Sequence, residues 1–79
     1  MTPPMDSTRT IYRYSYAFKG ELGPVRDSRA FQTEAEARKD AEDFQERGYW
    51  VIVWRERQRK TDGRWKTDFD DPFTQPLDD

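Results

Sequence analysis

The chain has 79 residues, neither cysteine nor histidine, and a charged fraction of 38%. A chain this short allows one domain of marginal stability, because it buries only ~60% of its extended-chain surface. Without cysteine there is no disulfide framework or thiolate metal site, and without histidine the commonest general base and metal ligand are missing. No apolar stretch approaches the ~18 residues of a membrane-spanning helix. A chain without cysteine fits a reducing, cytoplasmic setting.

The N-terminal third predicts an arm, a strand and a turn. Residues 1–8 contain two prolines and no periodic pattern, which indicates a disordered arm. Residues 9–19 alternate, which predicts a strand. One face carries Tyr12, Tyr14, Tyr16 and Phe18, and the other carries Ile11, Arg13, Ser15 and Ala17. A turn at 20–24 allows residues 25–31 to pair back as a short edge strand.

The middle of the chain predicts the one helix, over residues 33–48. Thr33 and Glu36 have the spacing of a capping box, and Gly48 stands where a left-handed C-cap residue is expected. A narrow apolar stripe follows at helical spacing: Ala37, Ala41 and Phe44. Because this stripe is mostly alanine, the helix can lie close to a sheet of large side chains.

Residues 49–60 predict the central strand, with six apolar or aromatic residues followed by six polar, mostly basic ones. The buried set is either Trp50, Ile52 and Trp54 or their neighbours Val51 and Val53. Residues 61–63 contain Asp-Gly, a strong hairpin signal, and residues 64–69 predict the returning strand.

These elements predict an α+β fold, an antiparallel three- to four-stranded sheet with one helix packed on one face, in the order β-(β)-α-β-β. The domain is expected at 9–69, after the arm at 1–8 and before an acidic tail at 70–79 that is loose or docked. One helix covers only one sheet face. The other face needs a lid, for which the tail, a second copy of the chain and a partner are the candidates.

Charged side chains suggest two kinds of binding surface. The first is a basic ribbon suited to a phosphate backbone, with Trp65 near it as a stacking residue: Arg55, Arg57, Arg59, Arg64 and Lys66. The acidic tail could occupy this ribbon within the same molecule. The second is a partner-binding set of carboxylates with one arginine and one tryptophan: Glu36, Asp40, Asp43, Asp70, Asp71, Arg13 and Trp65.

Catalytic chemistry is not expected. Neither a glycine-rich phosphate loop nor a metalloprotease or nucleophile-elbow motif occurs in the sequence. We therefore predict no enzymatic activity, no catalytic residues, no cofactor and no bound metal.

In size, acidity, lack of cysteine and coarse architecture, the whole chain resembles small phage-encoded inhibitors of bacterial defence, notably anti-CRISPR proteins. These inhibitors share no common motif, so the resemblance assigns no residue a role. It implies a non-catalytic protein-binding inhibitor that blocks a nucleic-acid-handling complex such as a CRISPR effector by occupying one of its surfaces. The carboxylates of this chain favour a basic surface. The alternatives are a small nucleic-acid-binding domain that uses the ribbon at 55–66, or a homodimerisation or subunit module.

Overall fold

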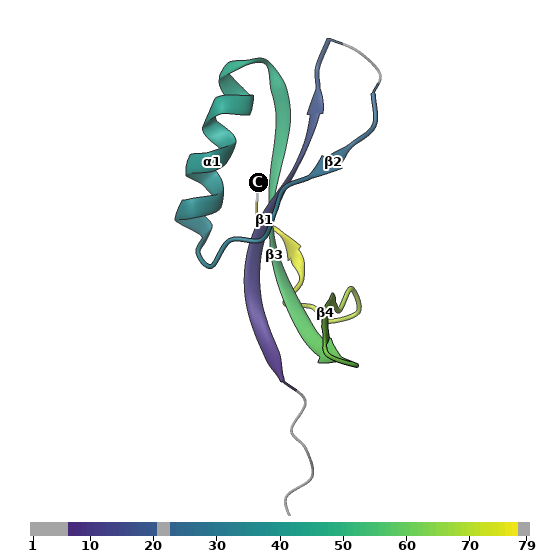
Figure 1. Ribbon diagram of the computed structural model, residues 1–79. Coiled ribbons are helices and arrows are strands. Elements are labelled where there is room, and N and C mark those ends of the chain that lie inside the picture. The colour runs from purple at the N-terminus through teal and green to yellow at the C-terminus, as the bar shows by residue number, and fades with distance from the viewer. Residues whose placement is uncertain (1–6, 21–22, 78–79) are drawn as a thin grey trace, which may run out of the picture.

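The computed structural model describes residues 7–20 and 23–77. Its elements are β1 (Thr8–Phe18), β2 (Arg26–Asp27), α1 (Glu34–Glu46), β3 (Tyr49–Thr61), β4 (Arg64–Thr67) and β5 (Gln75–Pro76). They form one antiparallel sheet in the order β2-β1-β3-β4, and β5 also pairs with β3. Figure 1 shows α1 lying alongside one half of the long β1–β3 pair, with β4 at the other end. The predicted α+β fold, one helix on an antiparallel sheet, is confirmed.

The pairing of β1 with β3 sets the two faces of the sheet. Tyr14 lies opposite Val53, and Ser15 lies opposite Ile52. Because successive side chains of a strand point to opposite faces, this register places the tyrosines of β1 with Val51 and Val53 beneath α1. The even-numbered residues of β3, including all of its tryptophans, lie on the other face.

The predicted edge strand at 25–31 pairs with β1 at both ends but is interrupted between them. Residues Arg26–Asp27 form β2, and Phe31 forms an isolated bridge with Tyr12. Between them, Ser28 donates its backbone N–H to the Tyr14 carbonyl, and its hydroxyl accepts a hydrogen bond from the Tyr14 N–H. Residues 21–22 of the predicted turn lie outside the described residues.

The helix begins and ends where the sequence indicates. The Thr33 hydroxyl accepts a hydrogen bond from the Glu36 N–H over 3.1 Å, and Gly48 has a φ of +88°. Ala37 and Ala41 are fully buried against the sheet and pack in one cluster with Tyr14, Phe31 and Val53. The small alanines allow the helix to approach these large side chains closely. Phe44 is only half-buried at the edge of this cluster.

The β3–β4 hairpin closes through the Asp62-Gly63 pair. Both residues have positive φ, 53° and 77°, and Thr61 lies opposite Arg64. Two central residues with positive φ are the signature of a type I′ turn, whose twist matches that of the flanking strands.

Residues 68–77 follow the edge of β3 and then cover part of its helix side. The Leu77 N–H donates to the Val53 carbonyl over 2.7 Å, and the Leu77 side chain packs against the core cluster. Of the predicted acidic tail, residues 70–77 are therefore docked, and 78–79 lie outside the described residues. The same is true of residues 1–6 of the predicted arm, whereas Thr8 already belongs to β1.

Candidate functional site

The two faces of the sheet carry different aromatic residues. Tyrosine and phenylalanine rings other than Phe69 pack on the helix side; for example, Tyr16 stacks on Phe44 with ring centroids 4.3 Å apart. All three tryptophans of the chain lie on the opposite side, because Trp50 and Trp54 alternate with the buried Val53 and Trp65 lies opposite Lys60. Of the two buried sets expected for β3, the valine set lies inward.

The face of the sheet that points away from α1 carries an apolar surface, which we call the open face. Its members are Ala17, Val25, Trp50, Ile52, Trp54 and Phe69. Four of them are unusually exposed for large apolar side chains: Val25 at 69%, Trp50 at 63%, Ile52 at 44% and Phe69 at 80%. Clustered exposure of this kind marks interaction surfaces, whereas single exposed apolar residues are ordinary.

Two adjacent depressions shape the open face. The first has a volume of about 250 Å³ and is lined by Ser15, Tyr16, Ala17, Val25, Trp50 and Ile52. The second, of about 160 Å³, is lined by Arg13, Ser15, Asp27, Trp54, Glu56, Thr67 and Phe69. They meet at Ser15, whose hydroxyl donates to Asp27 over 2.7 Å. The open face therefore combines a hydrophobic hollow with a smaller polar one.

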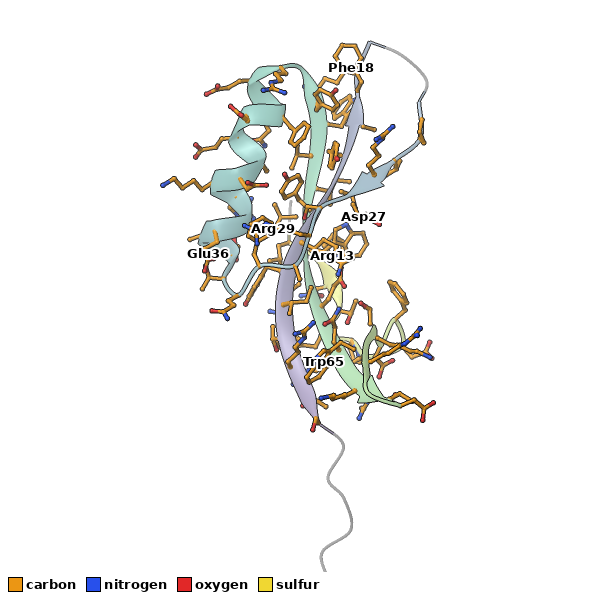
Figure 2. All side chains as sticks on the ribbon, viewed as in Figure 1. Arg13, Phe18, Asp27, Arg29, Glu36 and Trp65 are labelled. Atoms are coloured by element: carbon orange, nitrogen blue, oxygen red, sulfur yellow. The ribbon has the colours of Figure 1, made fainter. Side chains whose placement is uncertain are left out.

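A hydrogen-bonded polar network supports the second depression. The Thr67 hydroxyl donates to Glu56 Oε1 over 2.6 Å and accepts from Gln58 Nε2 over 3.3 Å. Gln58 also accepts from Arg9 Nε, and Arg13 forms an ion pair with Glu56 at 3.5 Å. Glu56 and Gln58 are both buried. The network fixes Arg13, a predicted partner-binding residue, against the sheet at the border of the open face (Figure 2).

The basic ribbon lies on the helix side of the β3–β4 hairpin, and residues 68–77 contact three of its five members, of which Arg55 and Arg57 are half-buried and Arg59 is exposed. Arg59 donates to Asp68 Oδ2 over 3.1 Å, and Arg57 lies 3.8 Å from Asp71 Oδ2. Arg55 and Arg57 both stack on the Phe73 ring, at 3.9 and 4.3 Å from its centroid. The tail thus occupies the ribbon within the same molecule, and only Arg64 and Lys66 lie beyond these contacts at the hairpin end, both exposed.

Trp65 does not accompany these cations. The register places it with Lys60 on the opposite side of the hairpin, where the guanidinium of Arg9 lies 4.4 Å from its ring centroid. The prediction that Trp65 stands beside the arginines of the ribbon as a stacking residue is therefore wrong. The structure keeps the five cations of the predicted ribbon on one face of the hairpin and places Trp65 on the other.

The predicted acidic residues of α1 lie along one flank of the helix, beside Phe31, and each has a local partner. Asp40 accepts a hydrogen bond from the buried Tyr14 hydroxyl over 2.6 Å. Glu36 belongs to the helix cap with Thr33, and Asp43 pairs with Arg47 at 3.6 Å. Of these three predicted partner-binding carboxylates, Asp40 has a structural role, because the Tyr14 hydroxyl bonds to it.

A shallow groove of about 450 Å³ runs beside the helix. Its lining combines carboxylates, two cations and one ring: Arg29, Phe31, Glu36, Lys39, Asp40, Glu42, Asp43 and Glu46. The Arg29 guanidinium lies 4.1 Å from the Phe31 ring centroid. This surface, which we call the acidic groove, lies on the far side of the sheet from the open face (Figure 2).

The candidate partner-binding residues thus fall into three separate groups, the first of which, Arg13 and Trp65, lies on the open-face side of the sheet. Glu36, Asp40 and Asp43 border the acidic groove, and Asp71 belongs to the tail that holds the ribbon. Asp70 is exposed beside it and donates its N–H to Asp68.

Sequence reasoning did not select the open-face residues Val25, Trp50, Ile52 and Phe69. Their signal was present in the unbroken apolar run at the start of β3. That run exceeds what one helix covers, but the sequence alone did not show which alternate residues face outward.

Within residues 7–20 and 23–77, no group of three or more histidine, cysteine, aspartate or glutamate side chains is arranged to hold a metal ion. The described part of the chain also has no helix with the length and apolar character to span a membrane. Comparison with known proteins finds no matching family model, no matching curated protein and no matching solved structure.

Proposed function

We propose that this chain is a non-catalytic protein-binding protein and that the open face is its principal contact surface. The observation that carries the proposal is the exposure of Trp50, Ile52 and Val25 around one hydrophobic hollow. Burying such side chains is favourable at about 25 cal/mol per Å² of apolar area. A protein partner offers the matching apolar surface.

The arrangement of the open face agrees with the anatomy of protein interfaces. Interface centres are rich in aromatic residues and poor in charge, and tryptophan is prominent among binding hot spots. Trp50 and Ile52 occupy the apolar centre here. Charged groups stand at the border, where Lys19 lies 4.7 Å from the Trp50 ring centroid and Asp27 holds Ser15.

The finer form of the proposal is an inhibitor that blocks a nucleic-acid-handling complex, such as a CRISPR effector, in a cytoplasmic setting. The acidic groove supports it, because exposed carboxylates along α1 complement the basic surface that such a complex offers to nucleic acid. Glu42 and Glu46 are the residues of this groove best suited to an outside contact, since they are exposed and do not hold Tyr14.

The test is affinity capture from the source organism with tagged wild-type protein and two variants, read by quantitative mass spectrometry. Ile52→Glu places a charge at the centre of the open face, and Glu42→Lys with Glu46→Lys reverses the acidic groove. We expect partners that are lost with Ile52→Glu. Partners that are lost only with the double reversal would assign the contact to the acidic groove instead.

The control is Thr61→Glu, which gives the same loss of a β-branched residue and the same charge on the same strand, away from the open face. Each variant is first checked for an unchanged circular dichroism spectrum and a cooperative melt. If Ile52→Glu, folded as wild type, captures the same proteins in the same amounts, the open face is not a contact surface.

A further inference from the structure

We propose that the open face is covered by a second copy of this chain, which makes the protein a two-fold dimer packed sheet against sheet. The inference rests on the proposed binding role of the open face and names the occupant of that same surface. It follows from three properties of the face: matching shape, sufficient apolar area and paired charge.

The open face carries both a projection and a hollow. The Trp50 side chain is 63% exposed, and the hollow beside it has a volume of about 250 Å³. A cavity of about 150 Å³ admits a benzene ring, so this hollow has room for an indole or a valine side chain. In a two-fold interface the same patch serves both copies, so the two hollows meet and enclose a common space that the bordering Trp50 and Val25 side chains can fill.

The apolar area is also what a dimer of this size requires. A standard interface takes about 800 Å² from each partner, and homodimer interfaces are ~65% apolar, which is about 520 Å². With aromatic side chains offering roughly 150–250 Å² each, the exposed parts of Val25, Trp50, Ile52 and Phe69 supply roughly 500 Å².

The charges on the open face are arranged for self-pairing. Ser15 and Ala17 lie in β1 with Asp27 opposite Ser15, and Lys19 follows the end of β1 with its ammonium over the Trp50 ring. A two-fold axis that runs parallel to the sheet, across β1 and above Ala17, places Lys19 of one protomer over the partner's Ser15. It brings Lys19 of one protomer towards the partner's Asp27, and the reverse pair forms at the same time.

Nothing in the described part of the chain competes for this surface. The tail, which was one candidate lid, lies on the helix side, where Phe73 stacks on Arg55 and Arg57. Dimerisation through the open face leaves both acidic grooves pointing outward, so that one dimer offers two of them to a target.

The test is sedimentation velocity of the full chain over a wide concentration range. We expect the weight-average mass to rise from 9.5 kDa towards twice that value. Ile52→Glu should stay at the monomer mass throughout, and its control Thr61→Glu should dimerise as wild type does. A dimer that persists in folded Ile52→Glu overturns the proposal, because another surface then holds it.

A second measurement places the axis. The chain has no cysteine, so a single introduced thiol reports one position. Under mild oxidation Ala17→Cys should form a disulfide-linked dimer much faster than Thr61→Cys, and equal rates overturn the arrangement.

If wild type stays at 9.5 kDa at every concentration, the second copy is excluded. The proposed function is judged separately, by the affinity capture. It stands if folded Ile52→Glu captures fewer partners than wild type, and it falls if both capture the same proteins in the same amounts.

Discussion

The Tyr14 hydroxyl donates a hydrogen bond to Asp40 Oδ2 over 2.6 Å and so connects a buried ring of the sheet to the middle of α1. Tyr14 is only 2% exposed, whereas Asp40 is exposed. The contact brings a solvent-facing carboxylate within reach of the phenol at the edge of the core. It gives Asp40 a structural role that the sequence pattern alone did not reveal.

Removing the donor of this hydrogen bond should destabilise the protein less than removing its acceptor. Tyr14→Phe removes the donor and leaves Asp40 to water, so we expect a loss of about 0.5–1.5 kcal/mol in the free energy of unfolding. Asp40→Ala leaves a buried hydroxyl unsatisfied and should cost about 1–3 kcal/mol. Urea unfolding of both variants measures the difference. Equal or reversed losses would mean that Tyr14 finds another acceptor.

Stability should also depend on Tyr14 at alkaline pH. Burial, and then the hydrogen bond to Asp40, raise the pKa of the Tyr14 phenol above its ordinary value. The folded state therefore keeps a proton that the unfolded chain releases above about pH 10. The contribution is complete below that pH and declines as the pH rises further. Unfolding free energies measured from neutral to strongly alkaline pH should fall less steeply for Tyr14→Phe than for wild type.

Replacing a buried alanine of α1 with a larger side chain should destabilise the protein. Ala41 is buried against the sheet, and Ala35, on the same helix, is exposed. Ala41→Leu forces additional methyl groups into a packed contact and should destabilise by about 1–3 kcal/mol. Ala35→Leu, a matched change on the outer side, should remain within about 0.5 kcal/mol of wild type. Similar melting temperatures for the two variants would contradict the close approach of helix and sheet.

The helix-on-sheet core was predictable from the sequence because its signals are local. Thr33, Gly48 and the Asp62-Gly63 turn act through neighbouring backbone atoms, and the alternation in β1 separates two faces by itself. The choice between Val53 and its neighbours in β3 was not predictable, since both alternating sets are apolar. The partners of Asp40 and Arg57 were also hidden, because Tyr14 and Asp71 are distant in sequence and meet only through the folded sheet.

The docked tail should loosen in acid. The hydrogen bond from Arg59 lowers the pKa of Asp68. The contribution of Asp68 to stability is therefore fully present above the ordinary aspartate range and is lost as the pH falls below that range, through the lowered pKa of the folded state. Asp68→Asn should therefore be less stable than wild type near neutral pH and match it in strong acid. Denaturation monitored at several pH values checks this, and a difference that persists unchanged in acid would exclude Asp68 as its origin.

The ribbon should bind nucleic acid poorly while the tail covers it. For wild type and a single-stranded oligonucleotide at physiological salt, we expect dissociation constants no tighter than the non-specific range of about 1–100 µM. Asp68→Asn with Asp71→Asn should tighten binding several-fold, because Arg57 and Arg59 lose their carboxylates. Binding should weaken with salt, with a slope near −0.7 per phosphate contacted.

The control for this measurement removes the same two charges elsewhere. Asp62→Asn with Asp70→Asn gives an identical change in net charge but leaves the ion pairs of Arg57 with Asp71 and of Arg59 with Asp68 in place. Fluorescence anisotropy compares the two double variants. Equal tightening in both would show a general effect of net charge and no competition by the tail.

The order of the strands along the chain has a consequence for folding. The β3–β4 hairpin closes across two residues, whereas β1 pairs with β3 across the whole helical segment. Closing a longer loop costs more chain entropy, so the hairpin and α1 should form early and β1 should join them last. Substitutions on the outer side of β1 should then change mainly the unfolding rate, and those in the hairpin the folding rate. Of the strands of this sheet, β1 is synthesised before the others and is thus expected to be placed last.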